Sequence, residues 1–338
     1  ILMNHGNFNI GDFQNNQDAL QNQFEAIVQN DPGEQEMPNF SVEEILANGD
    51  DDQMKILCNF TCQEFLEIYE IVREPLEIRH KGGRPGYYSP ATIFLITLAF
   101  LKSAMDFPSL QVQFGFTSTY LETLICNTVD LCSPILEKWG IRWIPMIENI
   151  QKNKLFRFHP QCIAAVDGSV QRIPRPSHEQ RSYYSGKYGF HCLKMQVAVG
   201  PQGFAVDVKG PYKGSVHDFT IFQLTNTKDK ILAERTRFVL TYPQINIPPI
   251  SALFDKGYIG VNNIIREAVI PIKKHRNHDY NDNQKDYNEK VAFDRIIVER
   301  WFGRHKTLWG IMFVPFPLKH SKYYSFYIFC AALTNFHI

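Results

Sequence analysis

The chain has no apolar run long enough to cross a bilayer and no signal for export. Its longest apolar run, residues 93–101, falls far short of the roughly 20 residues that a membrane-spanning helix needs. The start of the chain is polar and rich in Asn and Gln, with neither the basic beginning nor the apolar stretch of a secretory signal. We therefore expect no membrane partner and no export.

Charge of one sign and paired cysteines are also missing. The 35 basic and 35 acidic side chains give a net charge of zero, which excludes a polycation that wraps nucleic acid along its whole length. Any contact with DNA must come from local clusters of Lys and Arg. The seven cysteines form no CxxC pair, which favours a reducing intracellular compartment and argues against a structural zinc site.

What the sequence does have is a change in the pattern of apolar residues along its length. With 338 residues, 44% of them hydrophobic, the chain is long enough for two domains. Residues 1–40 are polar and weakly patterned, which predicts a mobile N-terminal arm, with one frayed helix as the alternative. Residues 41–150 carry the apolar stripes of helices, whereas residues 157–338 contain short Val- and Ile-rich runs that are typical of strands.

Helix-start signals recur in the region 41–150. Ser41 with Glu44, and Thr61 with Glu64, have the spacing of a capping box. Ser89 followed by Pro90 predicts the start of an apolar helix. A further Ser-Pro pair at 133–134 predicts the start of the last helix of this region.

A turn at residues 115–118 joins two predicted helices at the spacing of a helix-turn-helix module. The second of these helices, starting at Thr119, contains no Lys or Arg, so a direct reading of the DNA major groove by this helix is not favoured. Two core helices joined by a Gly turn remain an equal alternative. We expect the segment 41–145 to bind DNA poorly.

The order of predicted elements in residues 157–338 indicates a ribonuclease-H-like fold. Three strands, a helix, two strands and a final helix give an α/β domain with a mixed five-stranded sheet and flanking helices, preceded by the helical domain. The predicted strands are 161–174, 190–201, 203–211, 250–258 and 268–275, and the helices are 216–226 and 293–310, the latter preceded by a polar stretch at 276–290.

Three carboxylates fall where this fold would bring them together. Asp167 is expected at the end of the first strand and Asp255 at the end of the fourth, its neighbour in the sheet, while Glu299 would approach from the last helix. Hard divalent cations take oxygen ligands, and two ions about 3.5 to 4 Å apart can activate a nucleophile and neutralise a leaving oxygen in phosphodiester cleavage. The three side chains therefore predict a two-metal nuclease site.

Each carboxylate also has a simpler explanation. Asp-Gly is a common turn signal, which would account for Asp167 and, with Gly257 two residues later, for Asp255. Glu299 stands four residues after Arg295, so the two can form a surface ion pair worth about 0.3 to 0.5 kcal/mol. The occurrence of all three carboxylates in the expected elements and order favours the metal site.

Six segments carry a family resemblance: AAVDGS, YYSGKYGFHCLKMQVAV, GPYKGSVHDFTIF, LFDKGY, IIVERWFGRHK and FCAALTNF. From about Ile163 to its end the chain resembles the PIF/Harbinger-type transposases of the DDE endonuclease superfamily, which include the Harbinger-derived nucleases. Residues 61–129 resemble the helix-turn-helix module of that family more loosely.

The resemblance implies site residues and cofactors. It assigns Asp167, Asp255 and Glu299 as catalytic ligands of two Mg²⁺ (or Mn²⁺) ions. It places His217 and Asp218 as a secondary pair near the site, with Asp218 as a further metal or water ligand. Capping of the following helix is an equal alternative for this pair.

Basic residues flank these motifs and are candidate contacts to the DNA backbone. Each has the alternative of being a solvated surface charge. They are Lys187, Lys194, Lys256, Arg300, Arg304 and Lys306.

The function that the resemblance implies is that of a DNA transposase, an endonuclease that cleaves DNA strands at the ends of its element and transfers them to a target. The alternative is a domesticated relative that binds DNA or chromatin without cleavage. Implied partners are DNA, a separate Myb/SANT-like DNA-binding protein and further copies of the chain in a homo-oligomer, and the implied location is the nucleus.

Overall fold

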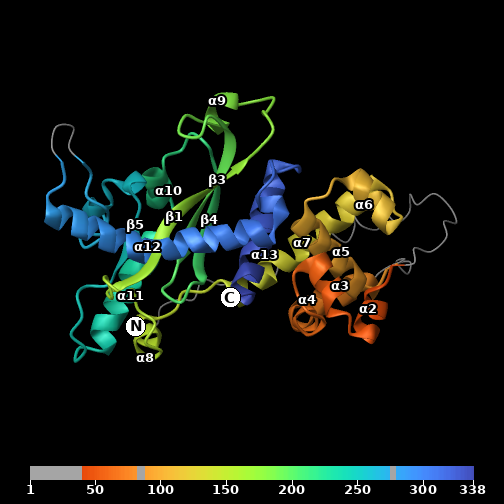
Figure 1. Cartoon of the computed structure of the whole chain (residues 1–338), viewed down its shortest axis with the longest axis horizontal. Helices are drawn as coiled ribbons and strands as arrows, with labels where there is room; N and C mark the ends of the chain where they lie inside the picture. Colours follow the sequence, from red (N-terminus) through yellow and green to blue (C-terminus); the bar gives the residue numbers. More distant parts are fainter. Residues whose placement is uncertain (1–39, 82–87, 275–278) are drawn as a thin grey trace. The chain divides into compact units, whose positions relative to one another are not determined.

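The computed structural model describes residues 40–81, 88–274 and 279–338 (Figure 1). Of the predicted N-terminal arm, residues 1–39 lie outside the described residues. Within the described part, no helix combines the length and the apolar character needed to cross a membrane.

Contacts divide the chain into two compact units, Ile1–Ile135 and Leu136–Ile338. The division falls inside helix α7 (Ser118–Gly140). The boundary expected from the sequence, between residues 150 and 157, lies within the second of these units.

The first unit is helical in its described part. Its central helix is α5, whose residues 94–101 are almost entirely buried because they are apolar on all sides. Three other helices, α2, α3 and α4, contact α5. The helices are α2 (Val42–Asn48), α3 (Asp51–Cys58), α4 (Cys62–Lys81), α5 (Pro90–Ser103), α6 (Phe107–Phe114) and the first part of α7.

The predicted helix starts are largely confirmed. Thr61 and Glu64 form the expected reciprocal cap, with the Thr61 N–H donating to Glu64 Oε2 at 2.7 Å and the Glu64 N–H to Thr61 Oγ1 at 3.2 Å. Ser89 caps α5 by accepting from the Thr92 N–H. Ser41 caps α2 through the Glu43 N–H, so Glu44 is not its partner.

Helices α6 and α7 are joined by a tight turn in which Gly115 adopts a left-handed conformation with φ of 78°. Helix α7 begins at Ser118 and runs without interruption past Pro134, so the separate helix predicted at Ser133 is wrong. Leu131 and Leu136 are buried on either side of Pro134 and keep the helix packed despite the missing N–H donor. The helix-turn-helix function of this pair stays a prediction.

The second unit is built on the predicted mixed sheet of five strands. Strand β3 pairs antiparallel with β1, β2 and β4, and β1 pairs parallel with β5. The strands are β1 (Cys162–Arg172), β2 (Tyr184–Ser185), β3 (Phe190–Val199), β4 (Ala205–Lys213) and β5 (Ser251–Phe254).

The strand predicted at 268–275 is wrong, and the short β2 is the fifth strand instead. Of this segment the structure describes residues 268–274, in which only a bridge between Val269 and Leu253 forms. Pro271 follows two residues later and has no N–H to continue a ladder of hydrogen bonds.

Helices flank the sheet. Helix α12 contacts β1, β3 and β5 and passes across the strands in Figure 1, α13 contacts β4, and α11 contacts β5. The helices are α8 (Met146–Gln151), α9 (Gln180–Tyr183), α10 (Asp218–Leu224), α11 (Thr227–Thr241), α12 (Asp282–Leu308) and α13 (Tyr323–Phe336), with 3₁₀ turns η1 (Lys256–Tyr258), η2 (Val261–Asn263), η3 (Gly310–Met312) and η4 (His320–Lys322).

Helix α12 starts eleven residues before the predicted helix 293–310, within the polar stretch 276–290. Asn281 and Gln284 form a capping box at its start. Ion pairs of Lys285 with Asp282 and of Lys290 with Asp286 line its first turns. A polar helix start of this kind has no apolar stripe, so the periodicity of the sequence does not reveal it.

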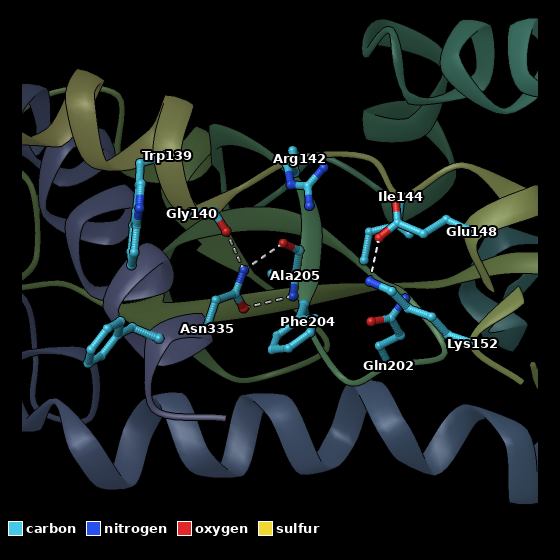
Figure 2. Close-up of a pocket in the computed structure, with 11 residues that line it drawn as sticks. Trp139, Gly140, Arg142, Ile144, Glu148, Lys152, Gln202, Phe204, Ala205 and Asn335 are labelled. Atoms are coloured by element: carbon cyan, nitrogen blue, oxygen red, sulfur yellow. Dashed lines mark hydrogen bonds and ion pairs between the residues drawn. The ribbon is translucent and has the colours of Figure 1, made fainter. Parts of the chain in front are cut away.

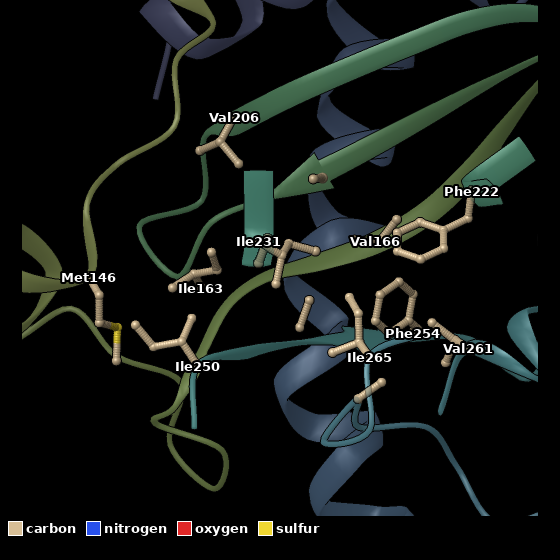
Figure 3. Packing of buried hydrophobic residues seen from close by; sticks show 14 of the residues in the cluster. Met146, Ile163, Val166, Val206, Phe222, Ile231, Ile250, Phe254, Val261 and Ile265 are labelled. Carbon is tan, nitrogen blue, oxygen red and sulfur yellow. The ribbon is translucent and has the colours of Figure 1, made fainter. Parts of the chain in front are cut away.

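A buried apolar cluster joins the sheet to its covering helices (Figure 3). Val166 of β1 and Phe254 of β5 pack there with Phe222 of α10, and the rings of Phe222 and Phe254 meet edge to face at 5.0 Å. Ile231 and Phe238 bring α11 into the same cluster. This packing holds β1 and β5 rigidly side by side.

Asn335 of α13 ties three segments together. Its Nδ2 donates to the carbonyl groups of Gly140 and Ala205, at 2.8 Å each (Figure 2). Its Oδ1 accepts from the N–H of Ala205 at 2.9 Å and from Trp301 Nε1 at 3.0 Å. The last turn of α13 is therefore bonded to the end of α7, the start of β4 and α12.

Asp294 fixes α12 to the segment that enters β1. Its buried carboxylate accepts from the backbone N–H groups of Arg157, Phe158 and His159, at 3.1, 3.0 and 2.9 Å. Nδ1 of His159 lies 2.8 Å from Asp294 Oδ2. Four donors on one carboxylate hold the helix in register with the strand.

We expect Asp294→Ala to destabilise the protein, because it leaves these buried donors without an acceptor. The free energy of unfolding should fall by about 3 kcal/mol, as for other broken buried networks. Urea denaturation followed by circular dichroism measures the change. Glu289→Ala removes an exposed carboxylate from the same helix and should change stability by less than about 0.5 kcal/mol; an equal loss in both variants would contradict the role of Asp294.

Candidate active site

Asp167 lies in the middle of β1 and not at its end. Its backbone pairs with Val197 of β3, and the pairing continues to Arg172, so the predicted turn at Asp167 is wrong. The Gly168 N–H donates to Asp167 Oδ1 at 2.7 Å. A strand that is paired on both sides holds this carboxylate in a fixed position.

Asp255 directly follows β5, as predicted. Phe254 pairs in parallel register with Val166, so Asp255 and Asp167 stand at equivalent positions on adjacent strands. Asp255 Oδ2 accepts from the Gly257 N–H at 3.3 Å and caps the turn η1. The expected proximity of these two strands is confirmed.

Arg295 of α12 joins the two carboxylates. Its Nη2 lies 2.9 Å from Asp167 Oδ2, and its Nη1 lies 3.3 Å from Asp255 Oδ1. The residue is 7% exposed. A single buried guanidinium thus bridges β1, β5 and α12.

Asp218, the first residue of α10, brings a third carboxylate to the cluster. Its Oδ1 lies 3.2 Å from Lys194 Nζ, and its Oδ2 lies 3.9 Å from Lys187 Nζ. Lys194 is buried and also donates to the carbonyl of Val216 at 2.7 Å. Asp218 makes these contacts in place of a side-chain cap, which α10 lacks.

Gly257 makes room for Asp218. A Cβ atom on Gly257 would lie 3.0 Å from Asp218 Oδ2, closer than such atoms normally approach. A Cβ atom on Gly168 would lie 3.4 Å from Asp218 Oδ1, an ordinary van der Waals contact. Gly168 lies within β1, so it does not begin a turn.

Two groups at this cluster, the Asp167 carboxyl and the Tyr258 hydroxyl, have raised pKa values. Burial raises the pKa of Asp167 to about 6, together with the charges of Asp255 and Asp218 and against the opposing effect of Arg295 and the Gly168 N–H. Burial also raises the pKa of the Tyr258 hydroxyl, and the three carboxylates add to this shift. Within the described residues the buried Tyr258 hydroxyl has no hydrogen-bond partner.

No ion pair joins Glu299 to the other described residues of this cluster. Glu299 is exposed, one turn after Arg295 on α12. The surface pair with Arg295 does not form, since Arg295 is bound to Asp167 and Asp255. The catalytic role of Glu299 stays a prediction, as does that of the exposed His217, which makes no capping bond.

The predicted DNA contacts differ in exposure. Lys187, Lys256, Arg300 and Arg304 are exposed. Lys306 is half-buried, and burial lowers the pKa of its ammonium group. Lys194 is bound inside the carboxylate cluster, as described above.

The donor set suits a hard divalent cation. Asp167, Asp255 and Asp218 offer only carboxylate oxygens, which Mg²⁺ and Mn²⁺ prefer. Among the described residues, however, no three acidic, His or Cys side chains are gathered closely enough to hold an ion between them. Asp167 and Asp255 are the pair best placed to share one cation, because the single guanidinium of Arg295 contacts both of them.

The pocket in Figure 2 has a different character. It has a volume of about 280 Å³ and is lined by aromatic and charged side chains that include Trp139, Arg142 and Phe204. None of the clustered carboxylates lines it. The chemistry of the chain therefore points to the edge of β1 and β5 and not to this cavity.

Sequence reasoning missed the role of Arg295, which was considered only as a partner of Glu299. The sequence holds no signal for this role, because the burial of Arg295 and Asp294, which makes each of them require partners, is visible only in the structure.

The raised pKa of Asp167 predicts a pH-dependent stability. A carboxyl group whose pKa rises from 3.8 to about 6 on folding favours the folded state most at low pH, and this contribution is lost as the pH rises through about 6. Relative to Asp167→Asn, the metal-free wild type should lose about 3 kcal/mol of unfolding free energy between pH 3 and pH 7. Urea denaturation of both proteins across this pH range measures the difference. If the unfolding free energies of the wild type and Asp167→Asn change with pH in parallel, the prediction is contradicted.

Comparison with known proteins identifies the family of the chain. Residues 166–335 match the DDE superfamily endonuclease family. The chain is also 23% identical over 272 residues to the "Probable transposase for insertion sequence element IS702" of Microchaete diplosiphon, an alignment that covers 80% of this chain and 89% of that protein. No solved structure matches. The family match spans half of the chain and includes all members of the carboxylate cluster, so the chain belongs to the DDE superfamily endonucleases.

Proposed function

We propose that this chain is a DNA transposase of the PIF/Harbinger type that cleaves and transfers DNA strands at the ends of its element. The observation that carries the proposal is the pair Asp167 and Asp255, placed at equivalent positions on adjacent strands in a DDE superfamily chain. Such a pair provides the oxygen ligands that metal-assisted phosphodiester cleavage needs.

The proposed cofactors are two Mg²⁺ or Mn²⁺ ions, since DDE superfamily nucleases generally use divalent metal ions. Asp167 and Asp255 would hold them, with Asp218 beside the pair and Glu299 as the proposed further ligand from α12. When bound, the ions would supply an activated water or 3′-hydroxyl nucleophile and neutralise charge on the leaving oxygen.

The residues of the chain provide the rest of the site. The paired strands β1 and β5 hold the two carboxylates at a constant separation, and the backbone N–H groups of Gly168 and Gly257 orient them. Lys187, Lys256 and Arg300 are exposed cations that would contact DNA phosphates near the acidic cluster.

The distribution of charge supports DNA as the partner of the second unit. Residues 136–338 carry 29 Lys and Arg against 16 Asp and Glu, a net charge of +13, whereas residues 1–135 carry 6 against 19, a net charge of −13. The overall charge of zero thus conceals a strongly basic unit, which attracts DNA, and a strongly acidic one, which repels it.

The acidic charge of the first unit also supports a partner protein. A helical unit of this charge is poorly suited to bind DNA ends by itself. We propose that end recognition depends on a separate DNA-binding protein of the Myb/SANT-like kind.

A second candidate is a domesticated relative that binds DNA without cleaving it. It is favoured by the bridging position of Arg295, whose single positive charge already offsets part of the negative charge of the two carboxylates. Cleavage assays separate the two candidates.

We expect Asp167→Asn, Asp255→Asn and Glu299→Gln each to lower the rate of strand cleavage by roughly 100-fold or more, because each would remove a group that acts in the transition state. DNA affinity should stay within about threefold, since most of it comes from phosphate contacts. Nicking of terminal-repeat DNA in Mg²⁺ and in Mn²⁺ measures the rate, and gel shifts measure binding.

Glu289→Gln, an exposed carboxylate of α12, is the matched control and should cleave like the wild type. Cleavage at the wild-type rate by the Asp167 or Asp255 variant would refute the site. If the wild-type protein binds DNA but does not cleave it with either Mg²⁺ or Mn²⁺, the domesticated relative without cleavage activity is favoured.

The segment 41–145 should bind DNA no more tightly than the roughly 10⁻⁴ to 10⁻⁶ M of non-specific binding, because its charge is acidic. Fluorescence anisotropy with terminal-repeat DNA, compared with the full chain, measures this affinity. Tight, sequence-specific binding by the segment would overturn the need for a partner.

A further inference from the structure

Arg295 contacts the two carboxylates that a metal ion would need. We propose that Arg295 is a positioning residue that occupies the space between Asp167 and Asp255 until a divalent ion enters, so that the guanidinium and the metal compete for one pair of carboxylates. This inference rests on the proposed function, because it takes these two residues as metal ligands.

The partners of the four carboxylate oxygens carry the argument. Asp167 Oδ1 and Asp255 Oδ2 accept from the backbone N–H groups of Gly168 and Gly257. The remaining two oxygens face the nitrogens Nη2 and Nη1 of Arg295. The backbone donors are fixed by the fold, so the oxygens facing Arg295 are the ones that a movement of a side chain can free.

The third carboxylate is neutralised independently. Asp218 has its own cations, the buried Lys194 and the exposed Lys187. Arg295 is therefore matched to the pair on β1 and β5, and its removal would leave the environment of Asp218 in place.

Burial explains why Arg295 stays in the metal-free protein. The residue is 7% exposed, and its Nε has no hydrogen-bond partner among the described residues. A buried guanidinium needs compensating anions, and these two carboxylates provide them.

A divalent ion changes this balance. It attracts the carboxylates more strongly than a single positive charge does, and it repels a guanidinium within a few ångströms in a poorly screened site. Entry of the metal must therefore displace the guanidinium, and that displacement weakens metal binding.

The opposite role for Arg295 makes an opposite prediction. If the guanidinium merely organises the carboxylates, its loss lets the two negative charges move apart and weakens metal binding. If it competes, its loss strengthens metal binding. The sign of the change in metal affinity decides between the two roles.

The experiment measures Mn²⁺ binding to the full chain without DNA, from the electron paramagnetic resonance signal of free Mn²⁺. Arg295→Gln should bind Mn²⁺ at least about tenfold more tightly than the wild type, within the range seen for groups that surround metal ligands. Arg295→Lys should bind about threefold more tightly, because one ammonium cannot bridge both carboxylates as the planar guanidinium does. Circular dichroism checks that each variant is folded.

Arg237→Gln is the matched control, since it breaks an Arg–Glu pair on α11 in which Arg237 Nη2 lies 2.6 Å from Glu234 Oε2. Its Mn²⁺ affinity should equal that of the wild type. Should Arg295→Gln fail to fold, the result for Arg295→Lys decides.

Suppose that Asp167→Asn abolishes Mn²⁺ binding, so that the metal site stands. Folded Arg295 variants that then bind Mn²⁺ as tightly as the wild type or more weakly would overturn only the proposed competition. Binding that survives Asp167→Asn, or no binding by the wild type and the Arg295 variants, overturns both the competition and the metal site. The two failures are thus distinguishable without any measurement of cleavage.

Discussion

The interaction on which the second unit depends is the pairing of one buried guanidinium with carboxylates on two strands. Asp167 and Asp255 provide the anions that compensate the buried charge of Arg295, and Arg295 reduces the repulsion between these two carboxylates. Asp294, the preceding residue, binds the backbone that leads into β1. Two adjacent residues of α12 thus set the position of the helix against both the entrance and the middle of the same strand.

Much of this architecture could be predicted from the sequence. Short runs rich in Val and Ile located four of the five strands, because such side chains favour the pleated and buried surface of a sheet. The order of the elements predicted that the strands of Asp167 and Asp255 are neighbours, and this is confirmed, although Asp167 lies within β1 and not at its end. Thr61 and Ser89 marked helix starts through their local hydrogen bonds, which do not depend on the rest of the fold.

The remaining features depend on contacts that a single sequence does not contain. Gly168 looked like a turn residue, but it lies within strand β1, which continues to Arg172 because its pairing with β3 continues. Arg295 and Glu299 share a spacing that suits a surface pair, yet Arg295 is buried against the partly exposed carboxylates of Asp167 and Asp255, and Glu299 is left exposed. The start of α12 follows from polar side chains that pair with one another, and hydrophobic periodicity cannot detect this. A long charged side chain binds an opposite charge within its reach, and only the folded structure shows which residue supplies that charge.

The opposite charges of the two units bear on how the protein behaves in solution. With a sequence isoelectric point near 7.3, the molecule carries little net charge at neutral pH and has little electrostatic repulsion to keep copies apart. The basic part of one molecule attracts the acidic part of another, and this attraction weakens as salt shortens the screening length to about 8 Å at physiological ionic strength. An oligomer that forms only at low salt concentration would therefore be held by the attraction between the oppositely charged units. An oligomer that persists at high salt concentration would be held by a packed, complementary interface.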